Sequence, residues 1–188
     1  MASTSDIRNG LCIEYSHDIF TIVEFQHVKP GKGNAFVRTR LKSLTTGRVI
    51  ENTFPAGHKI DTVRVERREY QYLYNDGETY NFMNNESFEE LALQENMIEN
   101  ADLMKEGAVA IILFHADKEM PLSVELPSNM VLEVTYTEPG LRGDTATNTL
   151  KAATVETGAE VRVPLFVNQG DFIRVDTRDR SYIERVKQ

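Results

Sequence analysis

Residues 36–43 alternate between two kinds of side chain, and this pattern constrains the fold more than any other stretch of the chain. The odd-numbered residues are apolar or carry a hydroxyl group, whereas the even-numbered residues include the cations Arg38, Arg40 and Lys42. Because successive side chains of a strand point to opposite faces, the segment is predicted to be a strand with one core face and one cationic face. The simplest interpretation is that these cations lie on a solvated outer face. The second interpretation is that they form a phosphate-binding surface.

Similar patterns recur along the chain, separated by turn signals such as Thr46-Gly47 and Asn75-Asp76-Gly77. The strands that they predict cover residues 19–28, 36–43, 49–50, 70–74, 80–82, 109–115, 120–126, 130–136, 161–167, 172–177 and 182–186. Two short helices are also predicted. A capping box at Ser87–Glu90 predicts one over 88–94, and Gly107 is expected to end a second over 101–106.

Tyr70, Tyr72 and Tyr74 share one phase of a predicted strand. An aromatic row on a sheet can stack nucleic-acid bases, but cross-strand packing in a core explains the same pattern, and we prefer that interpretation.

The character of the sequence changes near residue 63 and again near residue 127. These boundaries define three modules, residues 1–63, 64–127 and 128–188, each close to the lower size limit for an independent core. Closed barrels suit such small β modules because closure removes exposed strand edges. The predicted fold class is therefore all-β, with three tandem small barrels and one or two short helices.

The net charge of −8 argues against a general nucleic-acid binder, but the charge is unevenly distributed. The first module carries +2, the second −9 and the third −1. The acidic residues are concentrated in the second module, so the first and third modules are free to contact phosphate groups. Solubility alone also explains an acidic middle module.

Several classes of site are not expected. The single cysteine, Cys12, excludes an internal disulfide and a cysteine zinc site, which fits a reducing cytoplasm. No apolar run is long enough to span a bilayer, and no signal peptide is seen. The histidines lack metal-ligand spacing, and no serine or cysteine lies in a nucleophile motif. We therefore expect neither a metal site nor catalytic residues, and no cofactor.

The segment Lys29-Pro30-Gly31-Lys32-Gly33 joins two predicted strands and places Lys32 at the apex of a hairpin. It is not a nucleotide-binding phosphate loop, which needs Ser or Thr after the Gly-Lys pair and then a helix. Here Gly33 follows the lysine and a strand follows the loop. Pro30 and Gly31 form a strong turn signal, and Gly33 permits a sharp bend. A solubilising lysine on an ordinary hairpin is one interpretation. A cation carried on a narrow stalk, whose amine can be lengthened by modification, is the other.

Five motifs along the chain resemble those of bacterial elongation factor P. They are the tip KPGKGNAF at 29–36, the hairpin YLYNDGETYNFM at 72–83, the loop PGLRGDTA at 139–146, the signature Lys151-Ala152-Ala153, Gly158, Val161, Val163-Pro164, Val167 and Gly170, and VDTRDRSYIERV at 175–186. The resemblance covers essentially the whole chain, with the motifs in the family's order.

The resemblance implies an SH3-like, or KOW-like, N-terminal barrel followed by two OB-fold barrels, arranged in an L that resembles transfer RNA. It also implies a cytoplasmic, non-enzymatic translation factor. Such a factor binds both ribosomal subunits between the P and E sites, beside peptidyl-tRNA, and relieves stalling at consecutive prolines. No membrane partner is expected, and the chain is expected to act as a monomer.

Site residues follow from the same resemblance. Lys32 would point to the peptidyl-transferase centre, often lengthened in the family by a β-lysyl group that a separate lysine-modifying enzyme adds. Pro30, Gly31 and Gly33 would shape the tip, and Lys29 would contact phosphate. The further RNA-binding or ribosome-binding residues are Arg38, Arg40, Lys42, Arg142, Gly143, Asp144, Thr145, Tyr182 and Arg185.

Three alternatives remain open at this point. The initiation factor 5A family also has a modified tip lysine, but it has only two modules. An elongation-factor-P-like paralogue shares all three modules, and the lysine tip argues against it only because arginine is common there. A general OB-fold protein for single-stranded nucleic acid would use the tyrosine row for stacking. Its affinity would fall steeply with salt, and the charge of −9 on the middle module opposes it.

Overall fold

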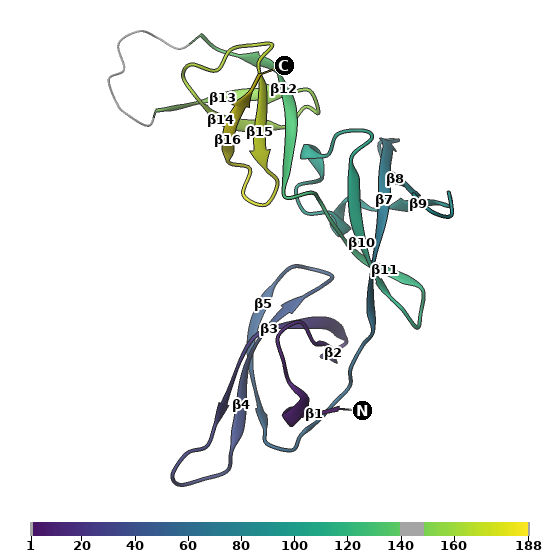
Figure 1. Ribbon diagram of the computed structural model, residues 1–188, viewed down its shortest axis with the longest axis vertical. Coiled ribbons are helices and arrows are strands. Elements are labelled where there is room, and N and C mark those ends of the chain that lie inside the picture. Colours follow the sequence, from purple (N-terminus) through teal and green to yellow (C-terminus); the bar gives the residue numbers. More distant parts are fainter. Residues whose placement is uncertain (1, 140–148, 188) are drawn as a thin grey trace. The chain divides into compact units, whose positions relative to one another are not determined.

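A computed structural model describes residues 2–139 and 149–187, and nearly all of its regular structure is β-strand. The strands are β1 (Ala2–Ser3), β2 (Cys12–Tyr15), β3 (Asp18–Val28), β4 (Phe36–Ser43), β5 (Val49–Pro55), β6 (Lys59–Ile60), β7 (Val65–Asn75), β8 (Tyr80–Asn84), β9 (Glu90–Leu93), β10 (Val109–His115), β11 (Met120–Glu125), β12 (Asn129–Thr137), β13 (Leu150–Val155), β14 (Glu160–Pro164), β15 (Phe172–Asp176) and β16 (Tyr182–Val186). Three single 3-10 turns, η1 (Thr4–Asp6), η2 (Glu95–Met97) and η3 (Ala101–Leu103), complete the elements (Figure 1). The all-β prediction is confirmed.

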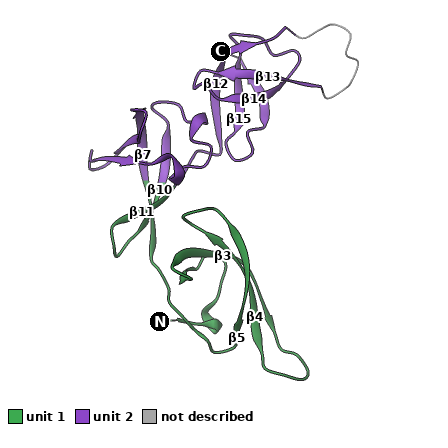
Figure 2. Ribbon diagram, turned by 180° about the vertical axis from the view of Figure 1, so that it is seen from behind, with its two compact units in different colours: residues 1–68, 112–123 green, residues 69–111, 124–188 purple. Residues whose placement is uncertain are grey.

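The strands form three main sheets with a small two-stranded pairing of β1 and β6. Their orders are β2-β3-β4-β5, β11-β10-β7-β8-β9 and β14-β13-β12-β15-β16. Neighbouring residues group into two compact units, residues 1–68 with 112–123 and residues 69–111 with 124–188 (Figure 2). Among the described residues, no helix is long and apolar enough to cross a membrane.

Strand β4 follows its predicted boundaries and its predicted faces. Val37, Thr39 and Leu41 are buried, whereas the cations between them face solvent. Val37 and Leu41 join Ile22, Phe54 and other apolar residues in the core of the first unit. Because one face is buried, a slip of one residue in register would expose this core, so the pairing of β4 is strongly specified.

The aromatic row on β7 is mostly core, as predicted. Tyr70 and Tyr72 are 5% exposed, and the Tyr72 ring lies 5.6 Å from Phe82 and 5.8 Å from Tyr80 between ring centroids. Burial raises the pKa of Tyr72 to about 12. Tyr74 differs, because a register shift between Tyr72 and Tyr74 turns its side chain to solvent. Two buried tyrosines and one exposed tyrosine do not form a stacking row.

The predicted helix over 88–94 is wrong. Glu90–Leu93 forms strand β9, which pairs antiparallel with β8. Ser87 accepts a hydrogen bond from the backbone of Glu89, which closes a local turn, and Phe88 has a φ of 60° that no α-helix permits. Pairing with β8 therefore prevails over the capping pattern.

The second predicted helix, over 101–106, is a single 3-10 turn, η3. It ends at Leu103, and Gly107 takes a φ of 84° as a turn residue. Short 3-10 turns of this kind commonly connect strands.

A bulge also changes the predicted faces of β12. Met130, Leu132 and Val134 are buried as predicted, but Tyr136 is 60% exposed and Thr137 is buried. The register of β12 against β13 shifts between Val134 and Tyr136. One extra residue exchanges the two faces beyond that point.

Candidate functional site: an exposed lysine tip and two outer surfaces

The β3–β4 hairpin carries the tip. Ladder pairing ends at Val28 and Phe36, so residues 29–35 form the connection. The residues from Lys29 to Asn34 are all exposed, and Lys32 lies in the middle of the loop. Figure 1 shows this end of the hairpin extending past the neighbouring strands of its own sheet. The lysine amine is therefore presented on a narrow support.

The two tip glycines have different structural roles. Gly33 has a φ of 111°, a conformation that residues with a Cβ rarely adopt. A Cβ on Gly33 would lie 3.8 Å from Pro30 Cγ, which is ordinary contact, so its constraint is backbone conformation and not space. Gly31 has no positive φ and nothing within 4 Å of an added Cβ. Gly33 thus determines the return of the chain into β4.

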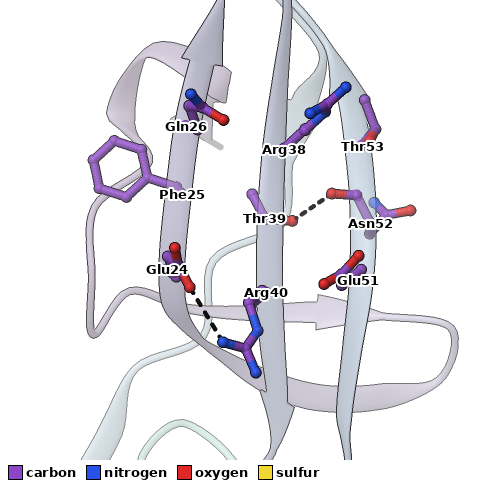
Figure 3. Close-up of a pocket in the computed structure, with 9 residues that line it drawn as sticks. All are labelled: Glu24, Phe25, Gln26, Arg38, Thr39, Arg40, Glu51, Asn52 and Thr53. Carbon is purple, nitrogen blue, oxygen red and sulfur yellow. Dashed lines mark hydrogen bonds and ion pairs between the residues drawn. The ribbon is translucent and has the colours of Figure 1, made fainter.

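The cationic face of β4 is exposed as predicted. Arg38, Arg40 and Lys42 all face solvent. Arg38 and Arg40 line an open hollow of about 320 Å³ on the outer face of β3, β4 and β5 (Figure 3). Such a surface can meet a phosphate backbone.

Acidic residues on the neighbouring strands partly neutralise this face. Arg40 pairs in register with Glu24 on β3 and Glu51 on β5. Its Nη1 donates to Glu24 Oε2 at 3.2 Å, as the dashed line in Figure 3 shows. Both side chains are more than half exposed, so the pair contributes little to stability and can exchange partners. Sequence reasoning missed these acids because only cross-strand register brings them beside Arg40.

Arg38 has different surroundings. Its register partners are Gln26 and Thr53, which carry no charge. Its guanidinium lies over the Phe36 ring, 5.5 Å from the centroid. This cation–π contact holds the arginine near the base of the tip without neutralising it.

The predicted loop at Arg142, Gly143, Asp144 and Thr145 lies outside the described residues. Tyr182 and Arg185 are described, and the structure brings both to the same aromatic ring, that of Phe166. The Tyr182 ring meets it edge-on at 6.4 Å, and the Arg185 guanidinium carbon lies 5.7 Å from its centroid. Burial raises the pKa of the Tyr182 hydroxyl.

Phe166 is a residue of this surface that sequence reasoning missed. The alternation over 161–167 predicts a continuous strand there, but β14 ends at Pro164 and Phe166 lies in the following turn, 57% exposed. The available signal was Pro164, because proline has no backbone N–H to donate to a strand ladder and is therefore rare inside a continuously paired strand.

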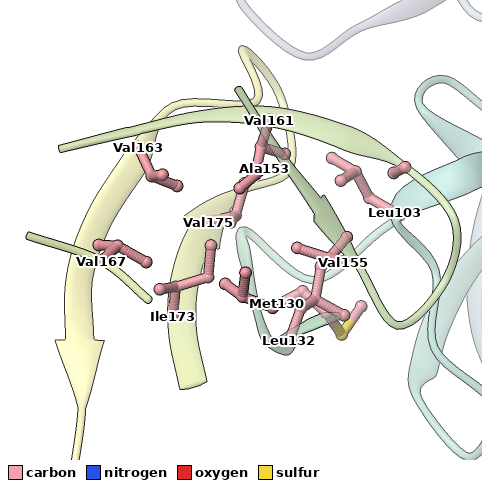
Figure 4. Packing of buried hydrophobic residues seen from close by; sticks show 12 residues of the cluster. Leu103, Met130, Leu132, Ala153, Val155, Val161, Val163, Val167, Ile173 and Val175 are labelled. Atoms are coloured by element: carbon pink, nitrogen blue, oxygen red, sulfur yellow. The ribbon is translucent and has the colours of Figure 1, made fainter. Parts of the chain in front are cut away.

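The core beneath this surface is formed mainly by valine, isoleucine and leucine side chains, with one methionine and two alanines. It includes Leu132, Val163, Val167 and Ile173, all completely buried. Leu103 of η3 lies in the same cluster, as Figure 4 shows. Tyr182 packs against this cluster, so the exposed aromatic surface has a rigid support.

In the described ranges, no cluster of three or more His, Cys, Asp or Glu side chains is placed to hold a metal ion. His17, His27 and His58 are exposed, whereas His115 is buried.

Three domain models of one protein family match most of the chain. Residues 3–60 match the KOW-like domain of elongation factor P, residues 65–124 match its OB domain, and residues 130–185 match its C-terminal domain. The chain belongs to the elongation factor P family. The resemblance to this family is therefore confirmed, and the KOW-like and OB domains that it implied are both detected. The proposed boundaries near 63 and 127 stay predictions.

Relatives named elongation factor P match over the full length of this chain. The protein from Flavobacterium johnsoniae is 58% identical over 188 residues, and that from Christiangramia forsetii is 60% identical over 188 residues. Each alignment covers 100% of both chains. An elongation factor P 1 from Porphyromonas gingivalis is 56% identical over the same length.

Among solved structures, the chain is similar to translation initiation factor 5A from Methanococcus jannaschii, with a TM-score of 0.52 and 19% identity. The similarity covers 67% of this chain and 90% of that one. A family member from Naegleria fowleri gives the same TM-score at 20% identity, over 66% of this chain and 96% of that one. At this identity the likeness shows the fold alone.

Proposed function

We propose that this translation elongation factor binds the ribosome between the P and E sites, beside peptidyl-tRNA, and accelerates peptide-bond formation where consecutive prolines stall it. The observation that carries this proposal is the position of Lys32, exposed in the middle of a seven-residue connection that extends from a long, tightly paired hairpin. A narrow loop can enter a channel that excludes a folded domain.

The contribution of Lys32 is positional. A peptidyl-prolyl ester reacts slowly because proline is rigid and its reacting end is poorly oriented. A cation beside the terminal nucleotides and the nascent chain reduces the number of non-reactive arrangements. Orientation of this kind is worth roughly 7–11 kcal/mol at the extreme for well-aligned reactants. The ribosome supplies the peptidyl transferase, and the factor is not an enzyme.

The outer face of the hairpin would position the factor. Arg38 and Lys42 would contact phosphates of the tRNA acceptor stem, with Lys29 near the tip as a further contact. Arg40 would join them when a phosphate replaces Glu24 as its partner. These contacts carry no sequence information, which suits a factor that acts beside many different tRNAs.

We propose that a separate lysine-modifying enzyme lengthens Lys32 by a β-lysyl type of addition. The exposed loop leaves the amine accessible to such an enzyme. The added amine would extend the reach of the tip and preserve its positive charge. On this proposal the factor works as a monomer in the cytoplasm, where the ribosomes are. Its C-terminal surface at Tyr182 and Arg185 would lie near the anticodon end of the tRNA.

The alternative of a general single-strand-binding protein is less well supported. It requires Tyr70, Tyr72 and Tyr74 to stack bases, but the first two lie in the core. Relatives that match over the whole chain are named elongation factor P, which favours that identity over the paralogue.

The decisive test is synthesis of a tri-proline peptide in a reconstituted translation system. We expect the native protein to accelerate this synthesis and to leave a proline-free peptide unaffected. Lys32→Ala should remove the acceleration and leave ribosome affinity within a few-fold of native. Loss of binding in Lys32→Ala, with full activity once bound, would contradict the positional role. No acceleration by the native protein would overturn the proposal.

A further inference from the structure

We propose that Phe166, held between Tyr182 and Arg185, is a stacking platform for an unpaired RNA base. This inference rests on the proposed function and specifies it: the C-terminal surface would recognise a looped or single-stranded segment of RNA, and not only duplex phosphate. Phe166 would be a binding residue in its own right, beside the two residues that the sequence already indicates.

The backbone that carries Phe166 is fixed on both sides. Val167 is completely buried, and its amide donates to Pro164 O at 3.1 Å. Asn168 donates from Nδ2 to the carbonyl of Phe166, also at 3.1 Å. The residue is therefore held in place while 57% of its surface stays open to solvent. An aromatic ring presented in this way loses little conformational entropy on binding.

Arg185 is oriented by two contacts. Its guanidinium carbon lies 5.7 Å from the Phe166 centroid, and its Nη1 lies 3.5 Å from Asp171 Oδ2. That same oxygen accepts a 2.8 Å hydrogen bond from the backbone N–H of Asn168. The arginine side chain is still 42% exposed. It can therefore meet a phosphate next to a base that stacks on the ring.

Tyr182 supports the ring through a separate contact. The two rings meet at an interplanar angle of 78°, and Tyr182 packs against the buried cluster of the C-terminal barrel. Edge-to-face packing of this kind fixes the orientation of the Phe166 ring and leaves aromatic surface available to a base.

A cation on the ring favours RNA as the partner, although Asp171 offsets part of the charge of Arg185. Proteins that hold single-stranded RNA combine exposed aromatic rings with arginine guanidinium groups. Phe88 provides an internal comparison. It is 70% exposed, but Glu86, Glu89 and Glu90 all lie within two residues of it along the chain. A base stacked on Phe88 would bring its phosphate against carboxylates. The cation that contacts the Phe166 ring makes that position the better partner for RNA.

The first test uses tryptophan fluorescence, because the chain contains no tryptophan. Phe166→Trp creates a single reporter that keeps the stacking surface, and Phe88→Trp is the matched control. The probes are a short RNA hairpin with an unpaired loop and a fully paired duplex of equal length. We expect the loop to quench the fluorescence of the Phe166→Trp variant and the duplex to have little effect, with no quenching in the control. Equal responses to both RNAs, or to both variants, would contradict a stacking site.

The second test is affinity for ribosomes that carry peptidyl-tRNA in the P site. Phe166→Leu keeps an apolar side chain and loses the aromatic face, so we expect affinity to fall about tenfold. Phe166→Tyr and Phe88→Leu should stay within about twofold of native. Circular dichroism confirms that each variant is folded. Loss of affinity in Phe166→Leu, with no quenching of the Phe166→Trp variant by the RNA loop, would identify a protein contact and overturn the inference.

The two proposals fail in different ways. If the native protein accelerates tri-proline synthesis but Phe166→Leu binds normally, only the stacking site is wrong. If the native protein gives no acceleration while the RNA loop quenches the Phe166→Trp variant, the proposed function is wrong and the RNA site remains.

Discussion

Arg180 and Asp102 lie 78 residues apart and meet through two contacts, Nη1 to Oδ1 at 2.9 Å and Nη2 to Oδ2 at 2.6 Å. This two-point pairing is reinforced by Asn100, whose Nδ2 donates to the carbonyl oxygens of Thr177 and Arg178. Leu103, one residue beyond Asp102, is completely buried in the C-terminal core. The η3 turn is therefore part of the C-terminal barrel's packing, although the sequence pattern places it in the preceding module.

Truncating Leu103 should show how much this turn contributes. We expect Leu103→Ala to lower the free energy of unfolding by about 2–5 kcal/mol, because it removes buried methyl groups and leaves a cavity. The matched control is Leu150→Ala, since Leu150 is 49% exposed. Urea denaturation followed by circular dichroism measures both. Similar small losses in the two variants would show that η3 does not belong to the core.

The tip glycines provide a prediction about activity. Gly33→Ala forces a residue with a Cβ to a φ of 111°, which costs about 1–3 kcal/mol locally. We expect the tip to rearrange, so that tri-proline synthesis slows at least severalfold while the melting temperature changes little. Gly31→Ala has open space and no positive φ, and it should be close to native. Equal activity in both variants would contradict a role for the Gly33 conformation.

The Glu24–Arg40 pair predicts an unusual gain of affinity. Glu24→Gln releases Arg40 and removes a charge that faces phosphate, so the variant should bind ribosomes more tightly. The slope of log affinity against log salt should steepen by about 1, the value for one additional phosphate contact. Glu14→Gln makes the same charge change at an exposed position on β2. If it has the same effect, net charge and not the release of Arg40 is responsible.

Asp76 predicts a specific acid sensitivity. Its carboxylate accepts hydrogen bonds from the Thr79 and Glu78 amides, which lower its pKa from 3.8 to about 2. A carboxylate whose pKa is lower in the folded state than in the unfolded state stabilises the fold when the pH is above the unfolded-state pKa. This contribution is lost as pH falls from about 4 to about 2. Asp76→Asn should thus be less stable than native at neutral pH, and the two should converge near pH 2. A stability difference that does not vary with pH would contradict this assignment.

Much of the strand pattern could be predicted because several strands, such as β4 and β14, bury every second residue. The limits of β4, β10 and β16 match residues 36–43, 109–115 and 182–186 as predicted. Tyr74 and Tyr136 lie where the two-residue alternation of buried and exposed side chains breaks down. In both strands a register shift changes the face of the following side chains, and neither bulge is marked by a glycine or proline. The bulge depends on the pairing strand, which a local pattern does not contain.

The site was predictable to a similar degree. Lys32, Gly33 and the outward direction of Arg38, Arg40 and Lys42 follow from local sequence. The residues that these groups contact do not follow from local sequence. Glu24 reaches Arg40 through strand pairing, and Phe166 reaches Arg185 through the fold of the C-terminal barrel. Long-range contacts of this kind require the three-dimensional structure.

The pairing of Arg40 with Glu24 has a consequence for a factor that works in a cell full of RNA. A hairpin with three unopposed cations would adhere to any exposed phosphate, and the free factor would be sequestered on transcripts and tRNAs. A carboxylate that already occupies one arginine makes casual encounters weaker. On the proposed function, the full charge would become available where several phosphates are held in a geometry that displaces the carboxylate. Restraint toward incorrect partners would in this sense be built into the same strands that carry the cationic face.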